Sequence, residues 1–469
     1  MRLPHCLGLG LCVFFLVSAS PPPGLQSHPS LAALPDTLLG LWVDSADPSG
    51  SRIHWGRFTQ PLPDSLGTLL ANGPGSETRG ALAVSGNWGV AVWEAWNTGV
   101  PDILAGALTV QSPAPLSGTV LSTGSASAVR PAAAANDSVA FLVWEDERAE
   151  PGDVYAARWD RGVGLRDPLG IPLATGASDQ RWPRVASGGA GFLAVWSEQV
   201  AGTYRVKVQA FDALGIPAAT ARFVSPAGTD ATWPDVSVAA GGYMVAWAES
   251  GGALGWVSVS VLGDSVASAA RYDPAGFAYG PRLAAGASGT VLAWTELTGA
   301  GRSHRRARLG APGALLPAQG LALTPPEDHA ADLALAASGD SVWAAWRIPL
   351  PDDEDDVFLA VFPAHDTVGV QTTFLMARTP DTPLAVPGPD HAGVLAHPNP
   401  FRSDVRFPLM APDESVEIFD AQGRSVRVLA GVESRRWDGR TASGRPVPAG
   451  VYWARGRSSG WSVRLVRLP

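Results

Sequence analysis

Carboxylates recur along this chain at nearly regular intervals, each one to three residues after a tryptophan that closes an apolar run. They are Asp44, Glu94, Glu145, Glu147, Glu198, Glu249 and Glu296. Two carboxylates on either side of a glycosidic bond can act as the acid and base of a glycosidase. In a binding protein the same groups would accept hydrogen bonds from a glycan or peptide. In a repeat they can also be inherited turn residues that support solubility without being used.

Aromatic side chains and one arginine stand close to these carboxylates in the pattern. Arg181, Trp182, Trp233 and Tyr279 each lie one or two residues before a proline that opens the next apolar run. In an antiparallel meander, the start of the first strand and the end of the second lie on the same rim. The sequence therefore predicts one face that combines carboxylates with aromatic rings able to stack on a ligand. The predicted binding residues are Trp182, Trp233, Arg181, Glu145, Glu198, Glu249 and Glu296.

Other chemistry has little support in the sequence. The chain contains no HExxH, GxSxG, GxGxxG or P-loop motif, no Asp-box and no recognisable arginine triad, so no catalytic residue is assigned. The acidic run DDEDD could be a solvated loop or could offer hard oxygen ligands to calcium. Its candidate ligands are Asp352, Asp353, Asp355 and Asp356. No other cofactor is expected.

The elements that would position these residues form a repeat. The tryptophans are Trp42, Trp93, Trp144, Trp196, Trp247, Trp294 and Trp346, at spacings of 51, 51, 52, 51, 47 and 52 residues. A proline stands 13 residues before the tryptophan in five copies, and Gly80 and Leu333 replace it in the other two. A period near fifty residues is typical of propeller blades. The sequence predicts an all-β chain with a seven-bladed β-propeller over residues 29–378.

Each copy reads as four short strands. In the fourth copy these are Pro183–Ser187, Phe192–Trp196, Tyr204–Phe211 and Arg222–Ser225. The second strand is almost wholly apolar, so both of its faces should be covered and its tryptophan should pack between blades. Each blade would be built from its own copy, which leaves no exchanged strand to close the circle. A ring of six or eight blades, or a pair of β-sandwiches, is the alternative.

The first 19 residues predict a secretory signal peptide. Arg2 gives the positive end, Leu7–Val17 the apolar segment, and Val17-Ser18-Ala19 a cleavage site. An uncleaved anchor is the alternative, but the apolar run is shorter than the roughly 20 residues that span a bilayer. Cys6 and Cys12 are the chain's 2 cysteines. A mature chain would thus have no disulfide and no thiol chemistry.

The charge of the chain argues against one class of partner. The formal net charge is −9, whereas nucleic-acid binding rests on basic residues that neutralise phosphates. After the predicted signal, no segment is long and apolar enough to cross a membrane. The expected partners are a glycan or protein on the propeller face and an export machinery.

The C-terminal part has a different character. Residues 379–394 are proline-rich and aperiodic, as in a linker, and residues 395–469 contain enough alternating runs for a small β-sandwich. HPNPF (His397–Phe401), FDAQGR (Phe419–Arg424) and WDGRTASGRPVPAGVYW (Trp437–Trp453) occur in order. These motifs resemble the immunoglobulin-like domain of flagellar hook-cap (FlgD) type and the sorting domain of the bacterial type IX secretion route. The resemblance implies export and retention at the cell surface.

The repeats also resemble those of secreted bacterial propellers, a resemblance that implies no activity. Taken together, these features favour an exported, non-enzymatic propeller that binds or scaffolds a partner at the cell surface. A sialidase-like glycoside hydrolase acting on extracellular glycans is the alternative. Both hypotheses place the functional residues on the rim that follows the tryptophans.

Overall fold

The structure is a computed structural model of the whole chain. It describes residues 26–35, 37–45, 50–58, 68–71, 73, 75–97, 99–111, 115–122, 126–149, 151–188, 191–265, 268–310, 313–324, 326–349, 356–365, 372–377, 404–407, 415–420, 425–430, 436–448, 450–456 and 462–467. The predicted signal peptide and the predicted linker lie outside these residues. The chain divides into two compact units, one mainly within Ser18–Gln371 and the other mainly within Pro380–Pro469.

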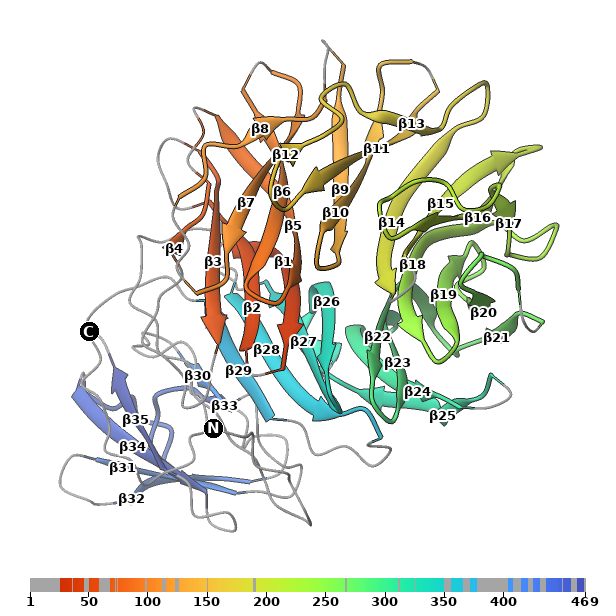
Figure 1. Cartoon of the computed structure of the whole chain (residues 1–469). Helices are drawn as coiled ribbons and strands as arrows, with labels where there is room; N and C mark the ends of the chain where they lie inside the picture. Colours follow the sequence, from red (N-terminus) through yellow and green to blue (C-terminus); the bar gives the residue numbers. More distant parts are fainter. Residues whose placement is uncertain are drawn as a thin grey trace. The chain divides into compact units, whose positions relative to one another are not determined.

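The first unit consists of seven antiparallel sheets arranged around an axis (Figure 1). Blades 1 to 3 are β1 (Gln26–Leu34), β2 (Thr37–Asp44), β3 (Arg52–Phe58), β4 (Thr68–Leu69); β5 (Ser76–Ser85), β6 (Trp88–Trp96), β7 (Asp102–Thr109), β8 (Thr119–Val120); and β9 (Ala128–Ala135), β10 (Val139–Asp146), β11 (Asp153–Asp160), β12 (Gly164–Leu165), β13 (Ile171–Ala174). In blade 3 both short strands β12 and β13 pair with β11.

Blades 4 to 7 repeat the four-stranded pattern without the additional strand. They are β14 (Gln180–Gly188), β15 (Gly191–Val200), β16 (Thr203–Asp212), β17 (Arg222–Phe223); β18 (Ala231–Ala239), β19 (Gly242–Glu249), β20 (Leu254–Ser260), β21 (Ala270–Tyr272); β22 (Phe277–Gly286), β23 (Gly289–Thr298), β24 (Gly301–Leu309), β25 (Leu315–Ala322); and β26 (Ala331–Ser338), β27 (Ser341–Ile348), β28 (Asp356–Pro363), β29 (Thr372–Ala377). A short 3-10 helix, Pro326–Asp328, connects the last two blades.

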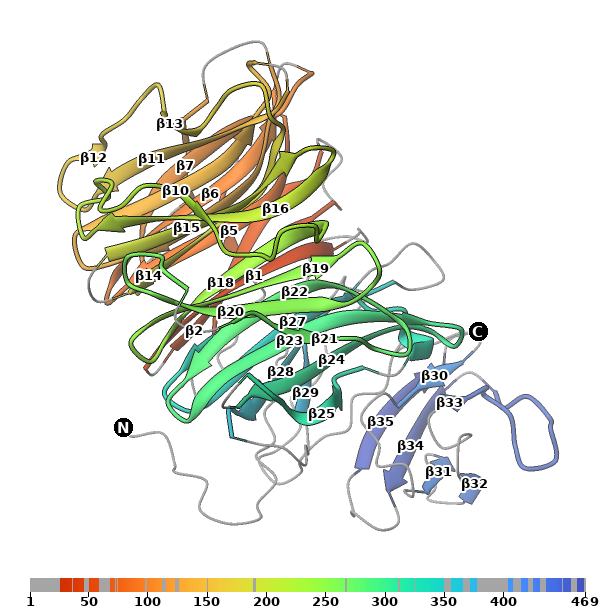
Figure 2. The ribbon, with the colours of Figure 1, turned by 90° about the vertical axis from the view of Figure 1, so that its right-hand side faces the viewer.

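The ring closes without a shared strand. The first strand of each blade contacts the first strand of the next, in the order β1, β5, β9, β14, β18, β22 and β26, and β26 in turn contacts β1. β1 also packs on β27, although its hydrogen-bonded sheet is its own blade, β1-β2-β3-β4. The prediction of a seven-bladed β-propeller whose blades are each one copy is confirmed. Figure 2 shows the same sheets from the side.

Indole side chains fill the interfaces between blades. The seven repeat tryptophans are at most 2% exposed. Trp93 packs in one cluster with Leu41 of blade 1, Trp144 with Val92 of blade 2, and Trp196 with Val143 of blade 3. The second strands are apolar on both faces for this reason, because each sheet is covered by a neighbour on either side.

The second unit has its own core. β31 (Val416–Asp420), β32 (Ser425–Leu429), β34 (Gly450–Gly456) and β35 (Ser462–Arg467) form one sheet, and β30 (Val405–Arg406) pairs with β33 (Arg436–Trp437). Residues of both sheets, among them Val405, Ile418, Trp437 and Leu465, share one buried cluster. The unit is therefore a small β-sandwich, as the sequence predicts. Across the part of the chain that the structure describes, no helix is long and apolar enough to cross a membrane.

Removing one of the interface indoles should destabilise the ring strongly. Trp144 is fully buried and donates its Nε1–H to Asp146 at 3.0 Å. We expect Trp144→Ala to cost about 3–5 kcal/mol, a large share of the roughly 5–15 kcal/mol that stabilises a typical domain. Calorimetry and urea unfolding followed by near-UV circular dichroism would measure it.

The control is Trp96→Ala in the neighbouring blade, because Trp96 is 43% exposed. Its substitution should change the free energy of unfolding by less than about 1 kcal/mol. Equal losses for the two variants would show that the indoles do not stabilise the blade interfaces.

Candidate functional site

Every inner strand of the propeller carries a β-bulge at the same place. The pairing of the first and second strands shifts register once in each blade. One residue in each bulge has a positive φ between 43° and 58°. These residues, which we call the bulge ring, are His28, Arg79, Arg130, Trp182, Trp233, Gly280 and Asp332.

The conformation of the bulge ring is unusual for its residue types. A positive φ is easy for Gly280 but costs of order 1–2 kcal/mol for a residue that has a Cβ. Four of the six other members also precede a proline, a position that normally favours extended backbone. A bulge re-aims the side chain of its first residue, and such strain is concentrated at functional sites. The six side chains therefore make this ring a candidate site.

The bulge ring surrounds the central channel of the propeller. A cavity of about 330 Å³ is lined by all seven inner strands. Its lining residues lie three to five positions after the bulge residue, for example Ala133–Ala135 after Arg130 and Val236–Val238 after Trp233. The residues there are small and mostly alanine or valine, and the charged and aromatic members of the bulge ring lie nearer the beginning of the same strands.

Two buried glutamates hold bulges of the neighbouring blade. Glu94, at the end of β6, accepts the backbone N–H of Arg130 at 2.7 Å and the hydroxyl of Thr78 at 3.0 Å. Glu145, at the end of β10, accepts the backbone N–H of Trp182 at 2.5 Å. Each glutamate thus satisfies a backbone donor that the bulge removes from the sheet. The strained conformation is stabilised from the adjacent blade.

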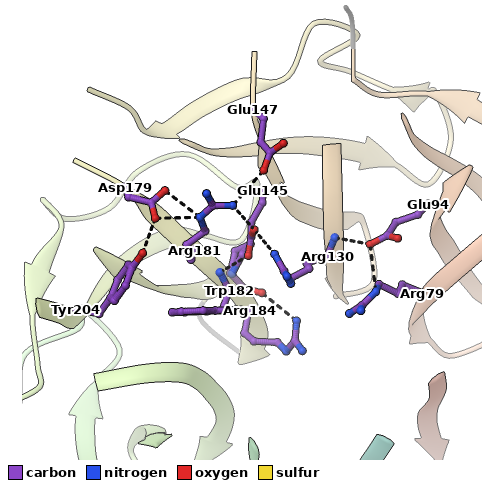
Figure 3. A network of polar contacts seen from close by, with 11 residues as sticks. Arg79, Glu94, Arg130, Glu145, Glu147, Asp179, Arg181, Trp182, Arg184 and Tyr204 are labelled. Atoms are coloured by element: carbon purple, nitrogen blue, oxygen red, sulfur yellow. Dashed lines mark hydrogen bonds and ion pairs between the residues drawn. The ribbon is translucent and has the colours of Figure 1, made fainter. Parts of the chain in front are cut away.

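Arginine side chains surround the same glutamates (Figure 3). Arg130 donates to Oε2 of Glu145 at 2.6 Å, and Arg181 lies 3.5 Å from that oxygen. Nε of Arg79 lies 3.8 Å from Oε1 of Glu94. Glu94 therefore lies between Arg79 and Arg130, and Glu145 lies between Arg130 and Arg181.

The acidic and basic side chains of this network differ in their exposure to solvent. The side chains of Glu94 and Glu145 are 3% and 0% exposed, whereas those of Arg79 and Arg130 are 48% and 36% exposed. Burial raises the pKa of Glu94, although the Arg130 N–H and the Arg79 guanidinium act in the opposite direction. The carboxylates form the wall, and the guanidinium groups face solvent.

Aromatic rings continue the bulge ring on the other side of Arg181. Tyr204, Trp182, Trp233, Tyr279 and Phe277 contact one another in that order, with ring centroids 5.2, 6.1, 5.7 and 6.3 Å apart. We call this set the aromatic arc. It crosses blades 4, 5 and 6, and Trp233 and Phe277 are 40% and 44% exposed. The structure thus brings together the three aromatic residues that the sequence places on one rim.

Arg181 itself is held firmly beside the arc. It lies 2.9 Å from Asp179 and 3.2 Å from Glu147, and Asp179 also accepts the hydroxyl of Tyr204. Burial opposes the charge of Arg181, but Asp179, Glu145 and Glu147 together raise its pKa. Burial and the bond to Asp179 raise the pKa of Tyr204 to about 12, so its hydroxyl stays protonated at neutral pH. Arg181 is a fixed cation rather than a titratable group.

Two residues after the bulge, the inner strands of blades 4, 5 and 6 carry the charged residues Arg184, Asp235 and Arg282. Nε of Arg184 lies 3.8 Å from Asp235, and Asp235 accepts the backbone N–H of Leu283 at 2.7 Å. Arg282 donates to the carbonyl oxygen of Leu333 at 3.0 Å. Burial and the nearby Arg282 lower the pKa of Arg184 to about 10. Burial raises the pKa of Asp235.

The remaining charged members of the bulge ring, His28 and Asp332, face each other across the closing seam. The backbone N–H of His28 donates to Asp332 at 3.5 Å, and Arg347 donates to the same carboxylate at 2.8 Å. Burial lowers the pKa of His28, which keeps the imidazole neutral at pH 7. The carboxylate of Asp332 is thus already engaged by the Arg347 side chain and the His28 backbone N–H.

The expectation that the post-tryptophan carboxylates share one accessible face requires correction. Glu198, Glu249 and Glu296 stand two residues after the tryptophan and therefore on the same side of their strand. Each lies 3.3–3.4 Å from the Nε1 of its own tryptophan. Each is also paired with a cation of its own blade, namely Lys207, Arg271 and Arg305. These three support blade packing, whereas Glu145 stands one residue after its tryptophan and holds Trp182 of the bulge ring.

Sequence reasoning missed Arg79, Arg130, His28 and Asp332. Each occupies the position just before the proline landmark or its replacement, the same position that gave Trp182 and Trp233. Aligning the repeats on that position would have found the whole ring. It also missed Asp146, which takes the role of the tryptophan partner in blade 3.

The calcium hypothesis falls mostly outside the described residues. Asp352, Asp353 and Asp355 are not among them, and of Asp356 only its place at the start of β28 is described. Within the described ranges, no group of three or more His, Cys, Asp or Glu residues is arranged to hold a metal ion.

Comparison with known proteins relates this chain to others through its fold. No protein-family model matches it, and no curated protein matches it. The match to a prolyl endopeptidase structure covers 94% of this chain and 54% of the endopeptidase chain, at 11% identity and a TM-score of 0.44. The match to a subtype N10 neuraminidase-like protein covers 60% of this chain and 92% of that protein's chain, at 9% identity and a TM-score of 0.41.

The match to the catalytic domain of a GH62 alpha-L-arabinofuranosidase of Coprinopsis cinerea covers 50% of this chain and 90% of that chain, at 9% identity and a TM-score of 0.31. At these identities the likeness concerns the fold alone. The chemistry of the site has to be read from its own residues.

Replacing Glu94 by Gln tests whether burial outweighs the nearby arginines in setting the direction of the pKa shift of this carboxyl. Folding raises its pKa above the ordinary 4.5. Above pH 4.5 and up to the folded-state pKa, the folded protein therefore holds a proton that the unfolded chain has lost. The contribution of this group to stability falls as the pH rises through that window, and the Gln variant lacks the fall. We expect the free energy of unfolding of Glu94→Gln, relative to the wild type, to increase with pH there.

Urea unfolding at several pH values between about 4 and 8 would measure this difference. A difference that decreases with pH would mean that Arg79 and Arg130 outweigh burial. The control is Glu249→Gln, which removes a carboxylate that pairs with Arg271 outside the bulge ring.

Proposed function

We propose that the propeller is a non-enzymatic binding module that takes a glycan at the mouth of its channel. The observation that carries this proposal is the aromatic arc beside the bulge ring. The apolar C–H face of a pyranose can stack on an exposed indole, while polar groups at the edge fix its orientation. Trp233 offers such an indole, and the neighbouring Trp182 is held by Glu145, which also contacts Arg181 and Arg130.

The arc suits an extended ligand. Its first four rings meet edge to face and span three blades, and Trp233 and Phe277 are exposed along it. Binding residues held by rigid strands lose little side-chain entropy when a ligand docks. The bulges, held by Glu145 and Glu94, supply that rigidity.

The hydrolase alternative would need two carboxylates free to act as acid and base. Glu94 has the raised pKa of a general acid. Its oxygens, however, accept Thr78 and the Arg130 backbone, and those of Glu145 accept Arg130 and the Trp182 backbone. Glu147 and Asp179 pair with Arg181. The carboxylates near the mouth are engaged in structure, which favours binding over catalysis.

The binding proposal is tested on a glycan array and by calorimetric titration of the best ligands. We expect Trp233→Ala to weaken binding by about tenfold or more, since loss of one aromatic stack costs of order 1–2 kcal/mol. The fold should be unaffected, because Trp233 is 40% exposed. The matched control is Trp453→Ala, an equally exposed tryptophan at 43% in the second unit.

Unchanged affinity of Trp233→Ala for every bound glycan would overturn the proposal. Release of reducing ends from those glycans, abolished by Glu94→Gln, would replace it with hydrolysis.

We further propose that the protein is exported and kept at the bacterial cell surface through its C-terminal unit. The signal-like first 19 residues, the ordered motifs of residues 395–469 and a separate core in that unit support this. A secretion machinery can recognise a unit that folds by itself and leave the propeller intact.

Deleting residues 395–469 should abolish surface display in a bacterium that has the type IX route. The truncated chain would accumulate inside the cell, as judged by surface labelling and cell fractionation. Trp233→Ala in the full-length chain serves as the control and should reach the surface normally. Surface labelling of the truncated chain equal to that of the full chain would refute the sorting role.

A further inference from the structure

We propose that the glycan is anionic, with its acidic group bound by Arg79 and Arg130 while its sugar rings lie on the aromatic arc. This rests on the proposed binding function and names the class of ligand that the same site would take. The observations that carry it are the unequal exposure of the two signs of charge and the link between Arg130 and Trp182 through Glu145.

Around Glu94 and Glu145, the accessible charge at the channel mouth is positive. Arg79 and Arg130 expose about half and a third of their side chains, and the glutamates paired with them are almost completely buried. Arg79 is only loosely held, at 3.8 Å from Glu94, and Arg130 uses one guanidinium nitrogen for Glu145. Guanidinium groups have five N–H donors, so both retain donors for a second acceptor. Carboxylate and sulfate groups accept such donors in pairs.

The cationic and aromatic parts of the site form one rigid unit. The two oxygens of Glu145 accept the Trp182 backbone N–H and the Arg130 guanidinium, at 2.5 and 2.6 Å. Trp182 of the aromatic arc and the accessible Arg130 are therefore fixed to the same carboxylate. A glycan that stacks on Trp182 and Trp233 would place a substituent of its next sugar unit near Arg130.

The surrounding groups leave this positive character in place. Six acidic groups of the described residues lie near the mouth or along the channel: Glu94, Glu145, Glu147, Asp179, Asp235 and Asp332. Each already has a cationic partner, and Arg184 and Arg282 add positive charge further along the channel wall. Burial raises the pKa of both Glu94 and Asp235, which weakens their negative charge as the pH falls. His28 remains neutral at pH 7.

The experiment compares acidic oligosaccharides with their neutral methyl esters, because the pair differs in charge but keeps the sugar backbone. The probes are oligomers of galacturonate, glucuronate and mannuronate, titrated calorimetrically into the full-length protein. We expect at least one acid to bind about tenfold or more tightly than its ester, since charge-assisted hydrogen bonds are roughly twice as strong as neutral ones. Raising sodium chloride from about 0.05 to 0.5 M should weaken binding of the acid only.

Two variants separate the charge from the stacking. The double variant Arg79→Gln and Arg130→Gln should remove the preference for the acid over the ester, whatever its effect on the affinity that the two ligands share. The matched control is Arg161→Gln, an exposed arginine whose guanidinium reaches the backbone of Asp137 in the β9–β10 hairpin, at the opposite end of the inner strands. Thermal unfolding of each variant checks that the fold persists, and Arg79→Gln alone provides a milder change if the double variant is unstable.

The outcomes are distinguishable. Equal binding of acid and ester by the wild type, or an acid preference that survives in both arginine variants, overturns the anionic ligand but leaves the binding function in place. Loss of acid preference together with unchanged affinity in Trp233→Ala supports the arginines and overturns the aromatic platform. Failure of the wild type to bind any acid or ester of the panel overturns the anionic ligand as stated.

Discussion

The architecture depends on burial of one indole per repeat between neighbouring sheets. A blade has two large apolar faces, and only another blade on each side can cover both. Seven copies achieve this because β26 packs on β1 and leaves no face exposed at either end. A buried indole N–H is stabilised by an acceptor, and a carboxylate two residues later provides it in blades 3 to 6, whereas Trp93 and Trp346 have no such acceptor among the described residues. Much of the acidic pattern in the sequence follows from this single requirement.

The two-residue period of a strand then divides the acidic residues between two tasks. Residues two positions after the tryptophan stabilise the interface, whereas Glu94 and Glu145, one position after it, face the next inner strand. There they accept backbone donors that the bulges leave unpaired. Adjacent positions of one strand thus serve two tasks. One position holds the strained residues at the channel mouth, and the next stabilises the packing between blades. The site is rigid because the scaffold is.

The sequence allowed the fold to be predicted more completely than the site. Repeat spacing, hairpin length and the apolar second strand sufficed for the blades, because those features are local or periodic. The grouping of Trp182, Trp233 and Tyr279 on one rim followed from strand direction alone. The bulge itself could not be foreseen, since a register shift depends on hydrogen bonds between strands, and the only sequence signal for Arg79 and Arg130 was their place before the proline landmark or its replacement. Treating all post-tryptophan acids as one set ignored side-chain alternation and misplaced Glu198, Glu249 and Glu296.

Closure without an exchanged strand has a consequence for the covalent order of the chain. Each blade is a contiguous piece of sequence, and the seam between β26 and β1 is formed by the same kind of contact as the six other boundaries. The position of the chain ends is therefore topologically arbitrary. A circularly permuted chain, opened between any two blades and rejoined across the seam, would arrange the same seven bulge residues in the same cyclic order around the axis.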